Sequence, residues 1–174
     1  MTIWDEFFGA LDNDQDAIIE LVESGRLALD AAHGEGNILT ATANGKRKLT
    51  QRLIDIGADV NLPAPGCLIR PLHVTASKNY PAIAAIHLRH GAEVNAKAAD
   101  GVRSEFFFSP HRGETALHLA AKYSDEPLVA LLLLHGADTT MRDANGDLPI
   151  DWLERRKDSL AKEAIRKMLT RSAP

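Results

Sequence analysis

The feature that most constrains this 174-residue chain is a short motif that returns at regular intervals. Gly57-Ala-Asp-Val-Asn61 is followed 34 residues later by Gly91-Ala-Glu-Val-Asn95, and Gly136-Ala-Asp-Thr-Thr140 comes 45 residues after that. If the period is about 33 residues, the second interval holds one repeat plus an insertion of roughly 12 residues. Gly25 lies 32 residues before Gly57 and indicates a degenerate first unit. Such a period predicts repeats that stack on their neighbours.

A second motif runs in phase with the first. Thr115-Ala-Leu-His-Leu-Ala-Ala121 begins 21 residues before Gly136, and Arg70-Pro-Leu-His-Val-Thr-Ala76 begins 21 residues before Gly91. Weaker copies start at Asn37 and Leu148. Together the two motifs resemble the ankyrin repeat, whose pattern includes T-P-L-H-x-A and closes with G-A-D-V-N. The resemblance implies an all-α, ankyrin-type solenoid of helix-turn-helix repeats with short β-hairpin fingers, acting as a non-catalytic protein-binding scaffold.

We expect one repeat domain over residues 1–174. It consists of a degenerate N-terminal capping repeat, three inner repeats and a C-terminal capping repeat, which cover residues 1–35, 36–69, 70–100, 113–146 and 147–174, with a finger insertion at 101–112. Apolar runs too short to be stable as isolated helices predict five helix pairs. Their ranges are 4–11 with 15–24, 38–44 with 48–56, 71–78 with 81–90, 116–122 with 126–135, and 149–156 with 158–170.

Several positions in the motifs have structural roles that physical chemistry explains. Proline suits the first position of a helix, because the N–H that it lacks has no partner there. Threonine caps a helix N-terminus, and glycine takes the left-handed conformation that ends a helix. In the family that the sequence resembles, the repeat histidine ties its loop to a neighbouring backbone. These roles fall on Pro71, Pro149, Thr115, Gly57, Gly91, Gly136, His73 and His118.

The inserted finger is the most informative departure from the repeat. It holds Phe106, Phe107 and Phe108, three of the five phenylalanines in the chain, between Arg103 and Arg112. Loops run over the surface, and aromatic residues and arginine are common anchors of protein interfaces. Two interpretations stay open. The rings bind a partner or a second copy, or they fold back over the array itself.

Charge is distributed unevenly along a chain whose net charge is −4. Residues 1–24 carry seven acidic side chains and no lysine or arginine, whereas residues 155–174 carry seven basic and two acidic side chains. Solvated capping repeats explain this pattern, and steering of a charged partner or head-to-tail contact is the alternative. The mild overall acidity gives no reason to expect nucleic acid or a membrane as partner.

Catalytic and metal-binding motifs are weak or missing. Cys67 is the single cysteine, and no G-x-S-x-G, phosphate-binding glycine loop or Cys-x-x-Cys occurs. Residues 12–23 place acids at the positions of a calcium loop, but Ala17 stands where that loop needs glycine, and a helix-to-helix turn at Asn13 and Asp14 explains the same residues. We expect His87 on an exposed or intermediate helix face. Because catalytic and metal-binding motifs are weak or missing, we expect no enzyme, no cofactor and no metal.

The expected function is binding of one specific protein through the concave face and the aromatic finger. The alternative is a dedicated inhibitor, such as a bacterial immunity protein that neutralises a toxin. With no signal sequence and no apolar run long enough to span a bilayer, we expect a cytoplasmic protein that is monomeric or self-associates weakly. The candidate contact residues are Arg70, Lys78, Phe106, Phe107, Phe108, Arg112, Lys122, Tyr123 and Arg155.

Overall fold

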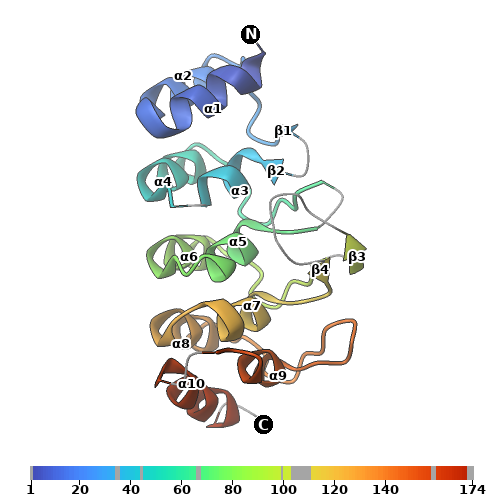
Figure 1. The fold of residues 1–174 in the computed structure, drawn as a ribbon. Helices are drawn as coiled ribbons and strands as arrows, with labels where there is room; N and C mark the ends of the chain where they lie inside the picture. The colour runs from blue at the N-terminus through green and yellow to red at the C-terminus, as the bar shows by residue number, and fades with distance from the viewer. Residues whose placement is uncertain are drawn as a thin grey trace.

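The computed structural model shows five helix pairs stacked in chain order, with the two termini at opposite ends of the stack (Figure 1). It describes residues 2–33, 36–43, 45–65, 68–98, 100–102, 111–157 and 160–171. The pairs are α1 (Ile3–Asn13) with α2 (Gln15–Glu23), α3 (Ile38–Ala43) with α4 (Arg47–Asp55), α5 (Pro71–Ser77) with α6 (Pro81–Arg89), α7 (Ala116–Tyr123) with α8 (Glu126–Leu134), and α9 (Pro149–Glu154) with α10 (Leu160–Arg171). The all-α solenoid expected from the motifs is confirmed.

Two short antiparallel strand pairs lie in the connections between helix pairs. β1 (Ala32–His33) pairs with β2 (Gly36–Asn37), and β3 (Asp100–Val102) pairs with β4 (His111–Arg112). The connections project from the side of the stack opposite α4, α6 and α8 (Figure 1). In the connections that follow α4 and α8, no described residue belongs to a strand. Among the described residues, strand pairs therefore occur in two of the four connections.

Local signals in the sequence account for where the helices begin. The Thr2 hydroxyl accepts a hydrogen bond from the Asp5 N–H at 3.1 Å, and the Asp5 carboxylate accepts one from the Thr2 N–H. Asp14 separates α1 from α2 and caps α2 through Ala17 N–H. Proline occupies the first turn of α5, α6, α8 and α9, where its missing N–H costs nothing.

The second helices α4, α6 and α8 end by one shared closure. Gly57, Gly91 and Gly136 follow them with φ values of +104°, +84° and +84°, which lie in the left-handed region that favours glycine. The next residue, an alanine in each case, donates its N–H to the carbonyl five residues earlier. This pattern satisfies carbonyl groups that a helix end leaves unpaired, and it turns the chain toward the finger.

The hydrophobic core consists of clusters that each combine residues from several helix pairs. An N-terminal cluster contains Phe7, Ile18, Leu39, Leu53 and Ile86, which come from α1, α2, α3, α4 and α6. A C-terminal cluster runs from Leu72 on α5 to Leu169 on α10, and a small third cluster lies at the base of the fingers around Ile69. Each pair is thus stabilised by its neighbours, as in other repeat arrays.

Asparagine side chains connect successive repeats on the finger side. Asn61 donates from Nδ2 to Gly91 O at 3.0 Å and accepts from Glu93 N–H at 2.8 Å. Asn95 makes the same two contacts one repeat later, to Gly136 O at 3.0 Å and from Asp138 N–H at 2.9 Å. One amide therefore satisfies both a helix-end carbonyl and a loop N–H of the following repeat.

The expectation for His87 was wrong. Its side chain is fully buried, at 0% exposure, because it occupies a core position of the second helix. Leu53, His87 and Leu132 each stand four residues before the helix-ending glycine, and both leucines are fully buried as well. Stacking buries this position whatever residue occupies it.

Candidate functional site

Four candidate contact residues form a row along the stack. Lys78 lies seven residues after the first residue of α5, and Tyr123 lies seven residues after that of α7. Lys122 and Arg155 lie six residues after the first residues of α7 and α9. α5 packs against α7, and α7 packs against α9. We call Lys78, Lys122, Tyr123 and Arg155 the first-helix face.

Lys122 and Tyr123 form the centre of the first-helix face. The Lys122 ammonium lies 5.0 Å from the centroid of the Tyr123 ring and 5.3 Å from that of Trp152 on α9. These cation–π contacts hold the half-buried lysine between two repeats. Tyr123 itself is 43% exposed, which leaves ring surface open for contact.

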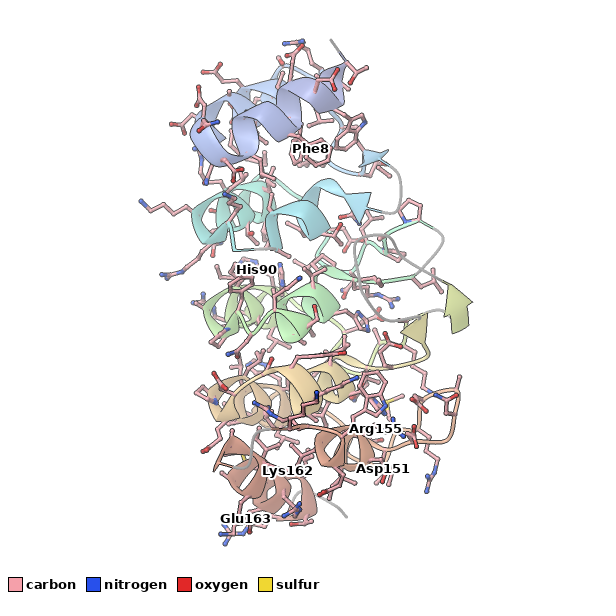
Figure 2. All side chains as sticks on the ribbon, in the orientation of Figure 1. Phe8, His90, Asp151, Arg155, Lys162 and Glu163 are labelled. Atoms are coloured by element: carbon pink, nitrogen blue, oxygen red, sulfur yellow. The ribbon has the colours of Figure 1, made fainter. Side chains whose placement is uncertain are left out.

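Arg155 is exposed but held in place by an acid of the preceding finger. Its Nη2 lies 2.6 Å from Asp147 Oδ2, and this hydrogen bond is the main cause that raises the pKa of Arg155 above its usual value. Figure 2 shows Arg155 just after the last residue of α9, near Asp151. Asp151 is occupied locally, because its carboxylate accepts the Leu148 N–H at 2.8 Å. Arg155 therefore presents a positioned guanidinium to solvent.

The structure places Arg70 in a different setting. Its side chain is half-buried, Nε donates to Asn61 O at 3.1 Å, and Nη2 lies 3.5 Å from Glu93 Oε2. These contacts tie the start of α5 to the connections on either side of its repeat. Arg70 thus lies apart from the first-helix face, in a position that joins neighbouring loops.

The inserted finger is described only at its base. Arg112 lies on β4 opposite Asp100, and Gly113 follows with φ +72°. Phe106, Phe107 and Phe108 lie outside the described residues, as does Cys67. The strand pair β3–β4 brings both ends of the insertion together on the finger side of the stack.

The repeat histidines attach each first helix to the next finger. His118 Nδ1 accepts from the Thr115 N–H at 3.2 Å, and Nε2 lies 3.1 Å from Asp147 O. His73 repeats the pattern with Arg70 N–H and Ala96 O, each at 3.1 Å. A carbonyl only accepts, so each ring is neutral with its proton on Nε2. Burial is the main cause that lowers the pKa of His118.

With Nδ1 of His118 an acceptor, the Thr115 hydroxyl donates to it at 2.9 Å. Thr115 is the N-cap residue of α7 by its extended backbone, and its hydroxyl joins the histidine contact. The start of α7 is thereby fixed to the connection between α8 and α9, which we call the fourth finger.

The fourth finger is anchored by a buried carboxylate that sequence analysis did not single out. Asp143 accepts from Trp152 Nε1 at 3.0 Å and from the N–H groups of Asn145 and Asp147 at 2.9 Å each. Burial would raise the pKa of Asp143, but these hydrogen bonds together lower it below its usual value. Trp152, which stands where the stronger repeat copies have Val74 and Leu119, was the one available sequence signal.

The acidic segment at residues 12–23 contains the end of α1, a helix-to-helix turn at Asp14 and the helix α2, as the alternative interpretation predicted. Asp12 pairs with Lys46, Asp16 pairs with Arg52, and Asp14 caps α2. Across the part of the chain that the structure describes, no group of three or more histidine, cysteine or acidic side chains is arranged to hold a metal ion. Within the same residues, no helix combines the length and apolarity needed to cross a bilayer.

Comparison with known families agrees with the repeat geometry. A family profile described as ankyrin repeats, in three copies, matches residues 38–143, which is more than half of the chain. The chain belongs to the ankyrin repeat family.

Similar curated proteins are longer than this ankyrin chain. It is 36% identical over 89 residues to rabankyrin-5 of Mus musculus, covering 51% of this chain and 8% of that protein. It is 35% identical over 95 residues to the BTB/POZ domain and ankyrin repeat-containing protein NOOT1 of Medicago truncatula, covering 53% of this chain and 19% of that protein. Human CAP-Gly domain-containing linker protein 3 is 26% identical over 170 residues, covering 93% and 29%. Ankyrin repeats generally serve protein–protein interaction and are typically non-catalytic.

Proposed function

We propose that this ankyrin array binds one specific protein through its concave side, represented by the first-helix face, together with the inserted finger at residues 101–112. The observation that carries the proposal is the row itself. Lys78 is exposed and its ammonium makes no hydrogen bond or ion pair with any described residue. Tyr123 is exposed beside it, one repeat along the stack. Neither side chain is needed to bury a core, so both are available to a partner.

Site-specific photo-crosslinking tests this proposal. A benzoylphenylalanine in place of Tyr123 should yield one specific crosslinked protein from a lysate of the native source. The matched control places the same group at Leu134, which is 82% exposed on α8, on the other helix of the same repeat. The same products from both positions, or none from Tyr123, would contradict a binding role for the first-helix face.

The inserted finger needs its own test, because two interpretations of its phenylalanines stay open. Replacing Phe106, Phe107 and Phe108 together by alanine should abolish the Tyr123 crosslink while the melting temperature stays unchanged. A large fall in melting temperature would instead assign the rings to the array's own packing. If the crosslinked partner is a toxic enzyme that the chain inhibits, the dedicated-inhibitor alternative is the correct form of the function.

A further inference from the structure

One exposed leucine departs from the pattern of the second helices. Leu134 on α8 is 82% exposed, the highest value among the large apolar side chains that the structure describes. It stands two residues after the fully buried Leu132. In the other second helices, the residues two positions after a buried core residue are charged and exposed, namely Glu23, Asp55, Arg89 and Lys167. The fold therefore does not require an apolar side chain here, and Leu134 is available to a contact outside the chain.

Leu134 belongs to an apolar stripe along α8. Pro127 and Ala130 are exposed, and Leu131 is half-buried. Their spacing of three, four and seven residues places all four side chains on one face of the helix. We call Pro127, Ala130, Leu131 and Leu134 the α8 stripe. α8 lies between α6 and α10, on the side of the stack away from the fingers (Figure 1).

The helices beside the α8 stripe carry charges of both signs. Glu163 and Lys167 on α10 are exposed at the positions equivalent to Ala130 and Leu134. The Lys167 ammonium lies 3.6 Å from the Glu163 carboxylate, so this face of α10 is acidic at one turn and basic at the next. On α6 the equivalent residue to Leu134 is Arg89. A surface that is apolar at its centre and of mixed charge at its edge matches a second surface of the same composition.

A two-fold axis lets the α8 stripes of two copies face each other in two ways. With the axis along the helices, α8 meets α8 in parallel and α6 lies opposite α10 of the second copy, which brings Arg89 next to Lys167. Like charges that face each other across an interface are disfavoured. With the axis along the stack, each second helix meets its own counterpart antiparallel, and Glu163 lies opposite Lys167 of the second copy.

One antiparallel register satisfies both helices. The residues of each pair, Ala130 with Leu134 and Glu163 with Lys167, stand four positions apart at equivalent places. The register that sets Glu163 opposite Lys167 therefore also sets Leu134 opposite Ala130. The small alanine side chain leaves room for the leucine of the second copy, as close packing of two helices requires.

We propose that a second copy of this chain binds the α8 stripe, with the two α8 helices antiparallel and Leu134 of each copy packed on Ala130 of the other. This inference goes beyond the proposed function and does not rest on it, because the first-helix face lies on other helices. Four apolar residues a side are few beside the roughly 20–30 of a standard interface, so the dimer is weak, with a dissociation constant on the order of 10–100 µM.

Sedimentation velocity between about 5 and about 500 µM measures this self-association. The average sedimentation coefficient should rise with concentration toward that of a dimer. Leu134→Glu should raise the dissociation constant at least about tenfold, because it places a carboxylate in the apolar contact. Leu68→Glu makes the same change at a leucine that is 48% exposed in the connection after α4, and should leave self-association unchanged.

Melting curves establish that both variants are folded. A chain that stays monomeric at about 500 µM would overturn the proposal, as would an equal loss of self-association in the two variants.

Disulfide trapping tests the orientation in chains whose Cys67 is replaced by serine. Under mild oxidation, a mixture of Ala130→Cys and Leu134→Cys chains should form a covalent dimer, because these positions face each other in the antiparallel register. Leu134→Cys chains alone should crosslink much more slowly. Faster crosslinking of Leu134→Cys chains with themselves would indicate parallel helices and contradict the proposal.

The self-association and the proposed function fail independently. A benzoylphenylalanine at Leu134 should crosslink to a second copy of the chain, whereas the Tyr123 product contains a different protein. If Leu134 instead crosslinks to a different protein in a lysate and the pure chain stays monomeric, that protein covers the α8 stripe and the self-association is wrong. The result at Tyr123 decides the proposed function in either case.

Discussion

At the scale of single residues, His87 is the least expected feature of the array. It fills a position that leucine occupies in neighbouring repeats, and neither ring nitrogen has a hydrogen-bond partner among the described residues. Burial, and secondarily the nearby His90, lowers the pKa of His87 to about 4. A buried polar group without a partner is costly, so this residue should destabilise the fold relative to an apolar side chain.

The pKa of His87 predicts acid sensitivity. The folded pKa of about 4 lies below the unfolded value of 6.5, so the unfolded chain takes up the proton first as the pH falls. The free energy of unfolding therefore keeps its full value above about pH 6.5. It falls as the pH is lowered toward 4, by roughly 3 kcal/mol at most from His87. Urea unfolding at about pH 7.5 and about pH 4.5 measures this loss. His118, whose pKa is also lowered, changes stability in the same direction.

Replacing His87 by leucine separates its part of the acid-induced loss of stability from the part that His118 causes. His87→Leu should raise the free energy of unfolding at neutral pH by about 1–3 kcal/mol, because the two unpaired nitrogens disappear. It should also reduce the pH dependence between about pH 7.5 and pH 4.5. His135→Leu, at an exposed position after α8, serves as the control. A His87→Leu variant with the full pH dependence of the parent would contradict this assignment.

Asn95 shows how a residue used only as a signature acquires a role through stacking. Its two hydrogen bonds cross to the next repeat, and their partners are far away in the sequence, so the motif alone could not reveal them. Asn95→Ala should lower the free energy of unfolding by about 1–2 kcal/mol. Thr140 stands at the equivalent position, but among the described residues its side chain bonds only to Asp138 in its own finger. Thr140→Ala should therefore cost clearly less, and equal losses would rule out a bridging role for Asn95.

At the scale of elements, the helix pairs were predictable and the fingers were less so. Apolar spacing, prolines and glycines are local signals, and helices depend mostly on local signals. Strand pairing in a finger depends on hydrogen bonds between two separate segments, so the sequence did not show in which connections strands form. Asp143 is the clearest case, because its contact with Trp152 requires the fourth finger to fold back onto α9.

Asp143 predicts a local loss of structure when it is removed. Asp143→Ala leaves the buried indole N–H of Trp152 and two loop N–H groups without their acceptor. We expect a loss of about 2–3 kcal/mol, since hydrogen bonds to charged groups exceed neutral ones in strength. Hydrogen exchange should rise most in residues 142–148. Asp138→Ala is the control, because that exposed acid receives bonds only within its own loop. Unchanged exchange at 142–148 would contradict the anchoring role.

At the scale of the whole molecule, the sequence predicted the stack and the charge asymmetry but not how either is organised. Two acids of the first repeat pair with bases of the second, which solvated capping repeats alone would not require. Such exposed pairs contribute little each. The first-helix face shows the same division: its side chains could be named from the repeat register, whereas the Asp147 contact that holds Arg155 depends on the folded finger.

The second helices α4 and α6, which pack against each other, each bury a polar side chain, and we call their junction the seam. Thr50 on α4 and His87 on α6 both bury side-chain atoms that have no hydrogen-bond partner among the described residues. The two large clusters also meet on α6, where Ile86 belongs to the N-terminal cluster and Ala84 and Leu88 belong to the C-terminal cluster. Cooperative unfolding of a repeat array depends on the interfaces between neighbours. This junction should therefore be the weakest one inside the stack.

The seam predicts unfolding in two steps. Native-state hydrogen exchange under increasing denaturant should show α2 and α4 opening at lower concentration than α7 and α8, because the seam transmits little stability from the larger C-terminal cluster. His87→Leu should bring the two halves toward one transition, because it replaces a buried polar ring by an apolar side chain, as at the equivalent Leu53 and Leu132. His135→Leu should leave the two steps as they are. A single shared opening free energy for all four helices in the unmodified chain would show that the junction between α4 and α6 is as strong as the others.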